Sequence, residues 1–149
     1  MQPILLATDG SPSAAAATDE AITLASALGV TLVAVAVEHV AVPAYGYYGY
    51  TQVLAELTKA EHDHVAEILE QTRQRATDAG VECETVALSG PVVETICKAA
   101  KEHRAAMIVI GAHGWGPLRR IVFGSVSSGV LHEAPCPVLV ARAPALVAV

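Results

Sequence analysis

Apolar residues along the chain form short continuous runs that alternate with longer helical repeats. The runs at residues 3–8, 30–37 and 106–110 are typical of strands buried on both faces of a sheet. Residues 81–88 at first alternate polar and apolar side chains, which favours an edge strand with one wet face. A fifth strand is predicted at Val138–Ala141.

Two helices are predicted in the first half of the chain from apolar positions that recur every three to four residues. The first begins near Ser11 or Ser13 and ends at Gly29, a natural terminator; its stripe comprises Ala17, Ala21, Leu24 or Ala25, and Leu28. The second covers residues 52–79 and is closed by Gly80. Its stripe comprises Leu54, Leu57, Val65, Ile68, Leu69, Thr72, Ala76 and Ala79.

Two shorter helices are predicted in the second half. One follows the break at Ser89-Gly90-Pro91, with inward positions Val92, Val93, Ile96, Ala99 and Ala100. The other runs from about Ser125 to His132. Strands that alternate with helices and are buried on both faces indicate an α/β fold with a parallel sheet and right-handed crossovers. In such sheets a ligand binds beyond the carboxyl ends of the strands, which places Asp9 beside the loop after residue 110.

Composition narrows the classes of protein that fit this pattern. The length of 149 residues suggests a single domain, residues 1–149, and 53% apolar content supplies a core. A net charge of −6 argues against a nucleic-acid partner. The widely spaced Cys83, Cys97 and Cys136 fit no metal pattern and are expected to be buried, reduced thiols. With no signal-peptide pattern and no apolar run near 20 residues, a soluble cytoplasmic protein without a membrane partner is expected.

The densest motif runs from Met107 to Ser128. An apolar strand ends in Gly111, a second glycine follows at Gly114, and Gly124-Ser125 opens the next helix. Glycines let backbone N–H groups approach a ligand closely, and a helix start adds free donors and the positive end of its dipole. The motif therefore predicts an anion site, with phosphate as the natural ligand.

The spacing Gly-x2-Gly-x9-Gly-Ser, together with Asp9 at the end of the first strand, resembles the nucleotide-binding members of the universal stress protein family. The resemblance extends from Ile4–Gly10 to Cys136–Arg142. It implies a Rossmann-like open sheet of five strands in the order 3-2-1-4-5 with helices on both faces. It also implies that the chain binds ATP (or AMP or ADP), with Mg²⁺ as a companion of the phosphates, and acts as a stress-response sensor or regulatory module. A homodimer through Val138–Ala141 is implied as well, and a bare apolar edge strand there would be an aggregation site.

The resemblance also assigns roles to positions of this chain. Asp9 and the Ala7 backbone would meet the adenine or ribose, and Ala36 would contact adenine through its main chain. Ile110 and Gly111 would lie near the ribose and phosphates. The phosphates would be held by N–H and hydroxyl donors of Gly114, Gly124, Ser125, Val126 and Ser127.

Some of these side chains have simpler explanations. Asp9 can serve as a helix cap, alone or in addition to binding a ligand. His113 suggests a general base, but no Ser–His–Asp arrangement surrounds it, which favours a structural or ligand-proximal role. The segment Tyr45–Tyr50 could cover the nucleotide, form a partner surface or be a plain loop, and Arg119 and Arg120 could neutralise phosphate or face solvent.

The same motifs leave alternative activities open. A slow ATPase or nucleotidyl-transfer enzyme of this fold is the main alternative. The Gly-x4-Gly-Lys-Ser/Thr loop of common NTPases is absent from the sequence, and no poised base is recognisable, so binding without catalysis is expected. A flavin carrier would need a hydroxyl-rich loop after the first strand, and none is found there. No metal-ligating set is expected.

Overall fold

The computed structural model describes residues 1–39, 50–113 and 124–143. Its strands form one parallel sheet in the order β3-β2-β1-β4-β5, as predicted. The strands are β1 (Ile4–Ala7), β2 (Leu32–Glu38), β3 (Cys83–Ser89), β4 (Met107–Gly111) and β5 (Val138–Ala141). β4 pairs with β1 and not with β3, so the strands after β3 are added on the other side of β1. The strand order therefore has its switch point between β1 and β4.

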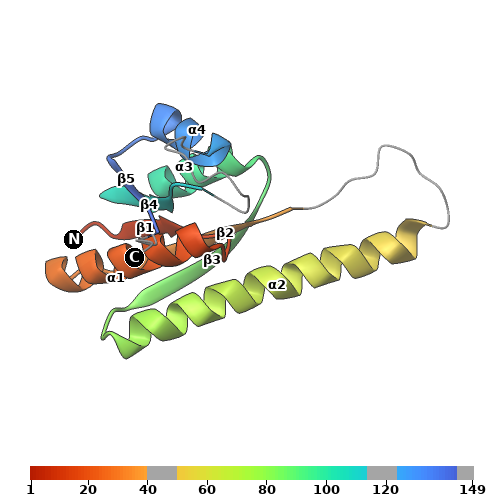
Figure 1. Cartoon of the computed structure of the whole chain (residues 1–149), viewed down its shortest axis with the longest axis horizontal. Helices are drawn as coiled ribbons and strands as arrows, with labels where there is room; N and C mark the ends of the chain where they lie inside the picture. The colour runs from red at the N-terminus through yellow and green to blue at the C-terminus, as the bar shows by residue number, and fades with distance from the viewer. Residues whose placement is uncertain (40–49, 114–123, 144–149) are drawn as a thin grey trace, which may run out of the picture.

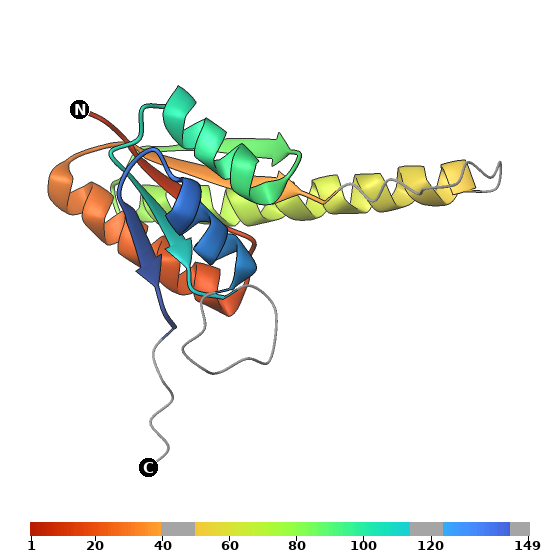
Figure 2. The same cartoon turned by 90° about the horizontal axis from the view of Figure 1, so that it is seen from above.

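Helices cover both faces of this sheet. They are α1 (Pro12–Leu28), α2 (Tyr50–Asp78), α3 (Val92–Glu102) and α4 (Ser125–Glu133). Figure 1 shows α1 and α2 below the sheet and α3 and α4 above it, and Figure 2 shows α3 and α4 side by side over the strands. The three-layer α/β fold expected from the sequence is therefore confirmed.

The core has two halves, one on each face of the sheet. Alternate strand residues point to opposite faces, so Leu6 and Ala36 pack with α1 and α2. Leu5, Ala7 and Val35 pack with the cluster that contains α3 and α4 residues. This alternation decides which side chains at the strand ends can reach a ligand above the sheet.

β1 ends at Ala7, whereas β4 continues one residue and β2 three residues past the level of Ala7. Ala7, the last residue of β1, is in register with Val35 on one side and Ile110 on the other. The chain then enters α1 through Gly10, whose φ of 76° is left-handed backbone that suits glycine. The ends of β1, β2 and β4 thus form one edge from which α1 begins.

Three predicted inward positions are wrong: Leu28, Leu57 and Ala79, the last of which follows the end of α2 and is exposed. Leu28 is 55% exposed because it is the last residue of α1. Leu57 is 56% exposed because the first turns of α2 extend past the sheet, as Figure 1 shows, and have no layer to pack against. The apolar stripe of α2 is buried only from Val65 onward.

Within the described ranges, no helix combines the length and apolar character needed to cross a membrane. Part of the tyrosine-rich segment, Tyr45 to Tyr48, lies outside the described residues. The three cysteines are half-buried rather than fully buried, and each is a free thiol. Burial raises the pKa of the Cys97 and Cys136 thiols, as expected of thiols that pack rather than react.

Candidate functional site

A cavity of about 330 Å³ opens at the carboxyl ends of β1, β2 and β4. It lies on the α3 and α4 side of the sheet, and the start of α1 closes one wall. Eight of the residues predicted from the sequence line it: Ala7, Asp9, Ile110, Gly111, Gly124, Ser125, Val126 and Ser127. Segments more than 100 residues apart in the chain are thus brought to one place by the strand order.

Two predicted site residues are not among those eight. Gly114 lies outside the described residues, together with Trp115, Arg119 and Arg120. Ala36 does not line the cavity, because its side chain faces α1 and α2 on the other side of the sheet. Its neighbours Val35 and Val37 line it instead, and the main-chain contact proposed for Ala36 stays a prediction.

The first turn of α4 carries donors that the helix itself does not use. Gly124 is the N-cap residue, and no side chain of the described residues accepts a hydrogen bond at this end. The first N–H groups of an α-helix have no acceptor within the helix, and here they belong to Ser125, Val126 and Ser127, all of which line the cavity. The positive end of the helix dipole adds to the attraction for an anion.

Ser127 has a different role from the one predicted for its hydroxyl. Its side chain is buried, and Oγ lies 3.0 Å from the carbonyl oxygens of both Ala112 and Gly124. A hydroxyl has one proton, so that proton is used within the protein, where it ties the end of β4 to the start of α4. The donors left open to an anion at this end are therefore backbone N–H groups and the exposed Ser125, whose hydroxyl has no partner among the described residues.

The two described glycines of the motif are needed for different reasons. A Cβ on Gly111 would lie 2.7 Å from the Ser13 carbonyl carbon and 2.9 Å from the Ala14 nitrogen, so only glycine lets the first turn of α1 pack against β4. Among the described residues, a Cβ on Gly124 would meet nothing closer than the Ala112 oxygen at 3.4 Å. Its φ of −60° does not require glycine either. Packing explains Gly111, whereas the described residues give no packing reason for Gly124, which borders the cavity.

Asp9 combines the two roles considered from the sequence. Its Oδ1 accepts a hydrogen bond of 2.9 Å from the Ser11 N–H, in the turn that leads into α1. The residue is exposed and lines the cavity, and Oδ2 has no hydrogen-bond partner among the described residues. One carboxylate oxygen therefore shapes the turn, and the other can accept from a ligand hydroxyl or amino group.

The two histidines at the cavity come from opposite rims. His113 follows β4, and its backbone N–H donates to Ser13 Oγ at 3.1 Å. No second side chain of the described residues bonds its ring, which fits the ligand-proximal role rather than that of a general base. His39 follows β2; sequence reasoning did not single it out, although its place just after a strand end was a usable signal.

The described lining contains little charge. Asp9 is its only carboxylate, and no lysine or arginine belongs to the part of the lining that the structure describes. The apolar residues, including Val35, Val37, Val92 and Ile96, lie toward β2 and α3, whereas the free N–H donors lie at α4. The cavity is therefore apolar at one end and rich in backbone donors at the other, a division that suits a flat apolar ring joined to an anion.

Comparison with known proteins agrees with this class of fold and site. The sequence model of the universal stress protein family matches residues 1–142, and the chain belongs to that family. It is 33% identical to a universal stress protein of Methanocaldococcus jannaschii over 95% of this chain and 82% of the relative. It is 31% identical to the universal stress protein YxiE of Bacillus subtilis over 93% of this chain and 97% of the relative.

Solved structures support the same assignment. The universal stress protein UspA from Lactobacillus plantarum superposes with a TM-score of 0.83 at 33% identity, covering 95% of this chain and 97% of that one. A family member from Arabidopsis thaliana, solved with AMP bound, superposes with a TM-score of 0.69 at 21% identity, covering 97% and 94%. One from Archaeoglobus fulgidus in complex with dAMP gives 0.64 at 24%, covering 95% and 98%. At these lower identities the likeness concerns the fold.

Proposed function

We propose that this protein binds an adenine nucleotide, ATP or its AMP and ADP relatives, in the cavity at the strand ends. One observation carries the proposal: α4 starts at an uncapped Gly124, whose missing side chain the packing does not require, and its free N–H groups border the cavity. Such a helix start is a ready anion site.

The dimensions of the site suit a nucleotide laid across the strand ends. A volume of about 330 Å³ is at the small end of the range for ligand cavities. β2 and β4 are separated by β1, so the two rims lie roughly 10 Å apart at the usual strand spacing. We place the phosphates at α4 and the base at the apolar β2 side, with Asp9 between them near the ribose. The bound AMP and dAMP of the two structural neighbours are consistent with this choice of ligand.

We propose that the chain works by binding rather than by hydrolysis. The described part of the site offers donors and apolar surface, and Asp9 already bonds the backbone through one oxygen. Within the described residues no group of three or more His, Cys, Asp or Glu side chains could hold a metal. Mg²⁺ would therefore arrive bound to the phosphates.

The remaining parts of the proposal concern the cell. We propose a cytoplasmic stress-response module that pairs as a homodimer through β5. This strand lies at the outer edge of the sheet, and its residues Val138, Leu139 and Val140 are only half-buried in one copy of the chain. Pairing would cover that edge. Light scattering at micromolar concentration tests the pairing, and a monomer would contradict it.

The direct test of ligand binding uses calorimetry with ATP on the purified protein. We expect saturable binding at or below near-millimolar ATP, and loss of that binding in Gly124→Val, whose side chain would occupy the phosphate end. Circular dichroism of the unliganded variant shows whether the fold is kept. Absence of any binding to the wild-type chain at near-millimolar ATP would overturn the proposal.

Two further measurements identify the ligand and the reaction. Mass spectrometry of material released from the purified protein should detect an adenine nucleotide. Phosphate release from ATP should be equal, and at background level, in the wild type and in Gly124→Val. Release that is higher in the wild type by a factor well beyond the scatter would favour the enzymatic alternative.

A further inference from the structure

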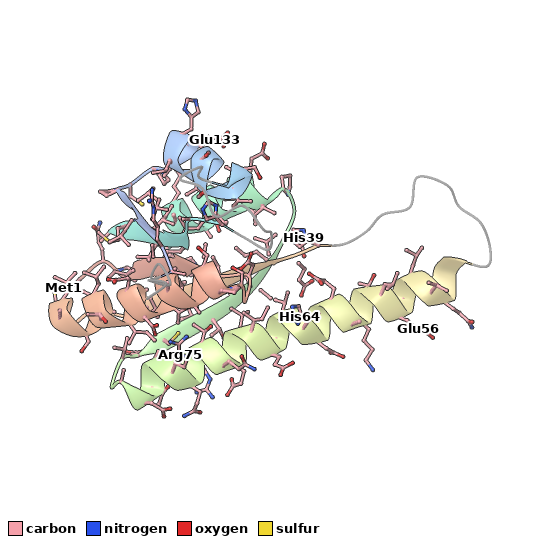
Figure 3. All side chains as sticks on the ribbon, viewed as in Figure 1. Met1, His39, Glu56, His64, Arg75 and Glu133 are labelled. Atoms are coloured by element: carbon pink, nitrogen blue, oxygen red, sulfur yellow. The ribbon has the colours of Figure 1, made fainter. Side chains whose placement is uncertain are left out.

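Two consecutive residues at the end of β2 are held by two consecutive residues in the middle of α2. His62 Nδ1 lies 2.7 Å from Glu38 Oε1, and the His39 N–H donates to Glu61 Oε1 at 3.0 Å. The partners are 24 and 22 positions apart in the chain. We call this pair of contacts the α2 clasp. Figure 3 labels His39 at the end of β2, above the middle of α2.

The clasp is more than a loose surface contact. The Glu38 side chain is only 14% exposed, so its carboxylate has few water molecules to replace the imidazole. The second contact fixes main chain, because the donor is the backbone N–H of His39. Just beyond the clasp, α2 is anchored by the buried Val65. The end of β2 is thus fixed by α2 at two adjacent points.

The clasp determines the position of one rim of the cavity. His39 lines the cavity, and so does Val37, two residues earlier in β2. The Glu61 carboxylate holds the backbone from which the His39 side chain projects. A change at Glu61, a residue absent from the lining of the cavity, therefore reaches the site through His39.

We propose that His39 is a contact residue for the nucleoside end of the bound nucleotide, and that Glu61 and His62 are positioning residues that act through it. This inference rests on the proposed function. The phosphate donors of α4 lie at the opposite rim, so His39 faces the base or ribose. An imidazole suits that place, because its flat ring can stack on a base and its nitrogens can bond a ribose hydroxyl.

The test separates the two ends of the ligand. Dissociation constants are measured for ATP, adenosine and inorganic tripolyphosphate, the last two by competition with ATP. Glu61→Ala should weaken ATP and adenosine by the same factor, about three- to tenfold, which corresponds to one lost hydrogen bond. Tripolyphosphate should bind as it does to the wild type. His39→Ala should show the same pattern, since it removes the contact itself.

Two variants serve as controls. Glu61→Gln keeps an oxygen at the accepting position and should restore ATP affinity to within about twofold of the wild type. Glu70→Ala removes an exposed carboxylate of the same helix that pairs with Arg73, away from the cavity, and should change no dissociation constant. Thermal unfolding without ligand reports whether each variant is folded.

The outcomes distinguish the inference from the proposed function. If the wild type binds no ATP, the proposed function fails. If the wild type binds but Glu61→Ala and His39→Ala bind ATP as well as it does, the inference fails alone. It also fails if tripolyphosphate weakens in parallel with ATP, because α2 would then act on the whole fold rather than on the nucleoside end.

Discussion

Two helices, α1 and α4, begin at the same edge of the sheet and border the same cavity, yet their first turns differ in chemistry. At α1 all the first-turn donors but one, the Ser13 N–H, are already used or absent. Ser11 Oγ accepts from the Ala14 N–H at 3.2 Å, Asp9 Oδ1 accepts from the Ser11 N–H, and Pro12 has no N–H at all. The start of α1 is therefore largely satisfied by side chains of its own sequence.

At the start of α4 the corresponding backbone N–H groups have no side-chain acceptor among the described residues. Gly124 replaces the capping side chain, and Ser127 turns its hydroxyl toward Ala112 and Gly124 instead of the cavity. Both helices have a dipole of the same sign, so the dipole alone does not choose between them. The difference predicts that an anion would prefer the helix start whose N–H groups have no acceptor among the described residues.

The strongest way to disturb the α1 start is Gly111→Ala. The new Cβ would overlap the backbone of Ser13 and Ala14, which cannot move without shifting α1. We expect a loss of about 2–3 kcal/mol in the free energy of unfolding, seen as a fall in Tm of roughly 5–10 °C. Thermal denaturation followed by circular dichroism measures it. An unchanged Tm would mean that the glycine is not required for packing.

Gly124→Ser would turn the start of α4 into one like that of α1. The new hydroxyl can accept from the N–H of Val126 or Ser127 and so competes for the donors that phosphate would use. We expect ATP affinity to fall about tenfold, or roughly 1.4 kcal/mol, while Tm without ligand stays level or rises by about 1 °C. Calorimetry and thermal denaturation give the two numbers. A gain in affinity would show that an open helix start is not what binds the phosphates.

Ser11→Ala would make the opposite change at α1, because it removes the side-chain cap from the start of this helix. The Ala14 N–H loses its acceptor at a fully buried position. We expect a cost of about 1 kcal/mol, or roughly 2–4 °C in Tm. The matched control is Ser128→Ala, an exposed serine in α4 that caps neither helix, which should leave Tm unchanged. Equal Tm values for wild type and Ser11→Ala would contradict the capping role.

The smallest change in ATP affinity is expected from Ser125→Asp, which adds a negative charge to the first turn of α4. Without ligand, the carboxylate should stabilise the helix start by about 0.3–1 kcal/mol. With ligand, it should repel phosphate and weaken ATP about threefold or more, and added salt should reduce both effects because Ser125 is exposed. Calorimetry at two salt concentrations measures the repulsion. Stronger ATP binding in this variant would argue against phosphate at α4.

Much of the fold follows from local pattern. The runs that became β1, β2 and β4 are apolar on both faces, so they could only be interior strands, and Ser11 and Gly29 delimit α1 by their own backbone chemistry. The strand order 3-2-1-4-5, implied by the family resemblance, is confirmed. Pattern failed at Leu57, because periodicity reports the face of a helix but not where the sheet beneath it ends.

The site divides in the same way. The sequence alone placed Asp9, Gly111 and Gly124-Ser125 at strand ends and a helix start, and its resemblance to the family added the rest of the eight predicted residues that line the cavity. Only the tertiary structure decided how they are used: that Gly111 makes room for α1, that the Ser127 proton is used inside the protein, and that Ala36 faces away from the cavity. The tertiary structure also brought the Glu61 carboxylate within hydrogen-bond distance of the His39 N–H. Spacing along a chain determines local backbone geometry. These contacts depend instead on the direction of each side chain and on which distant segments lie next to each other, and tertiary packing determines both of these.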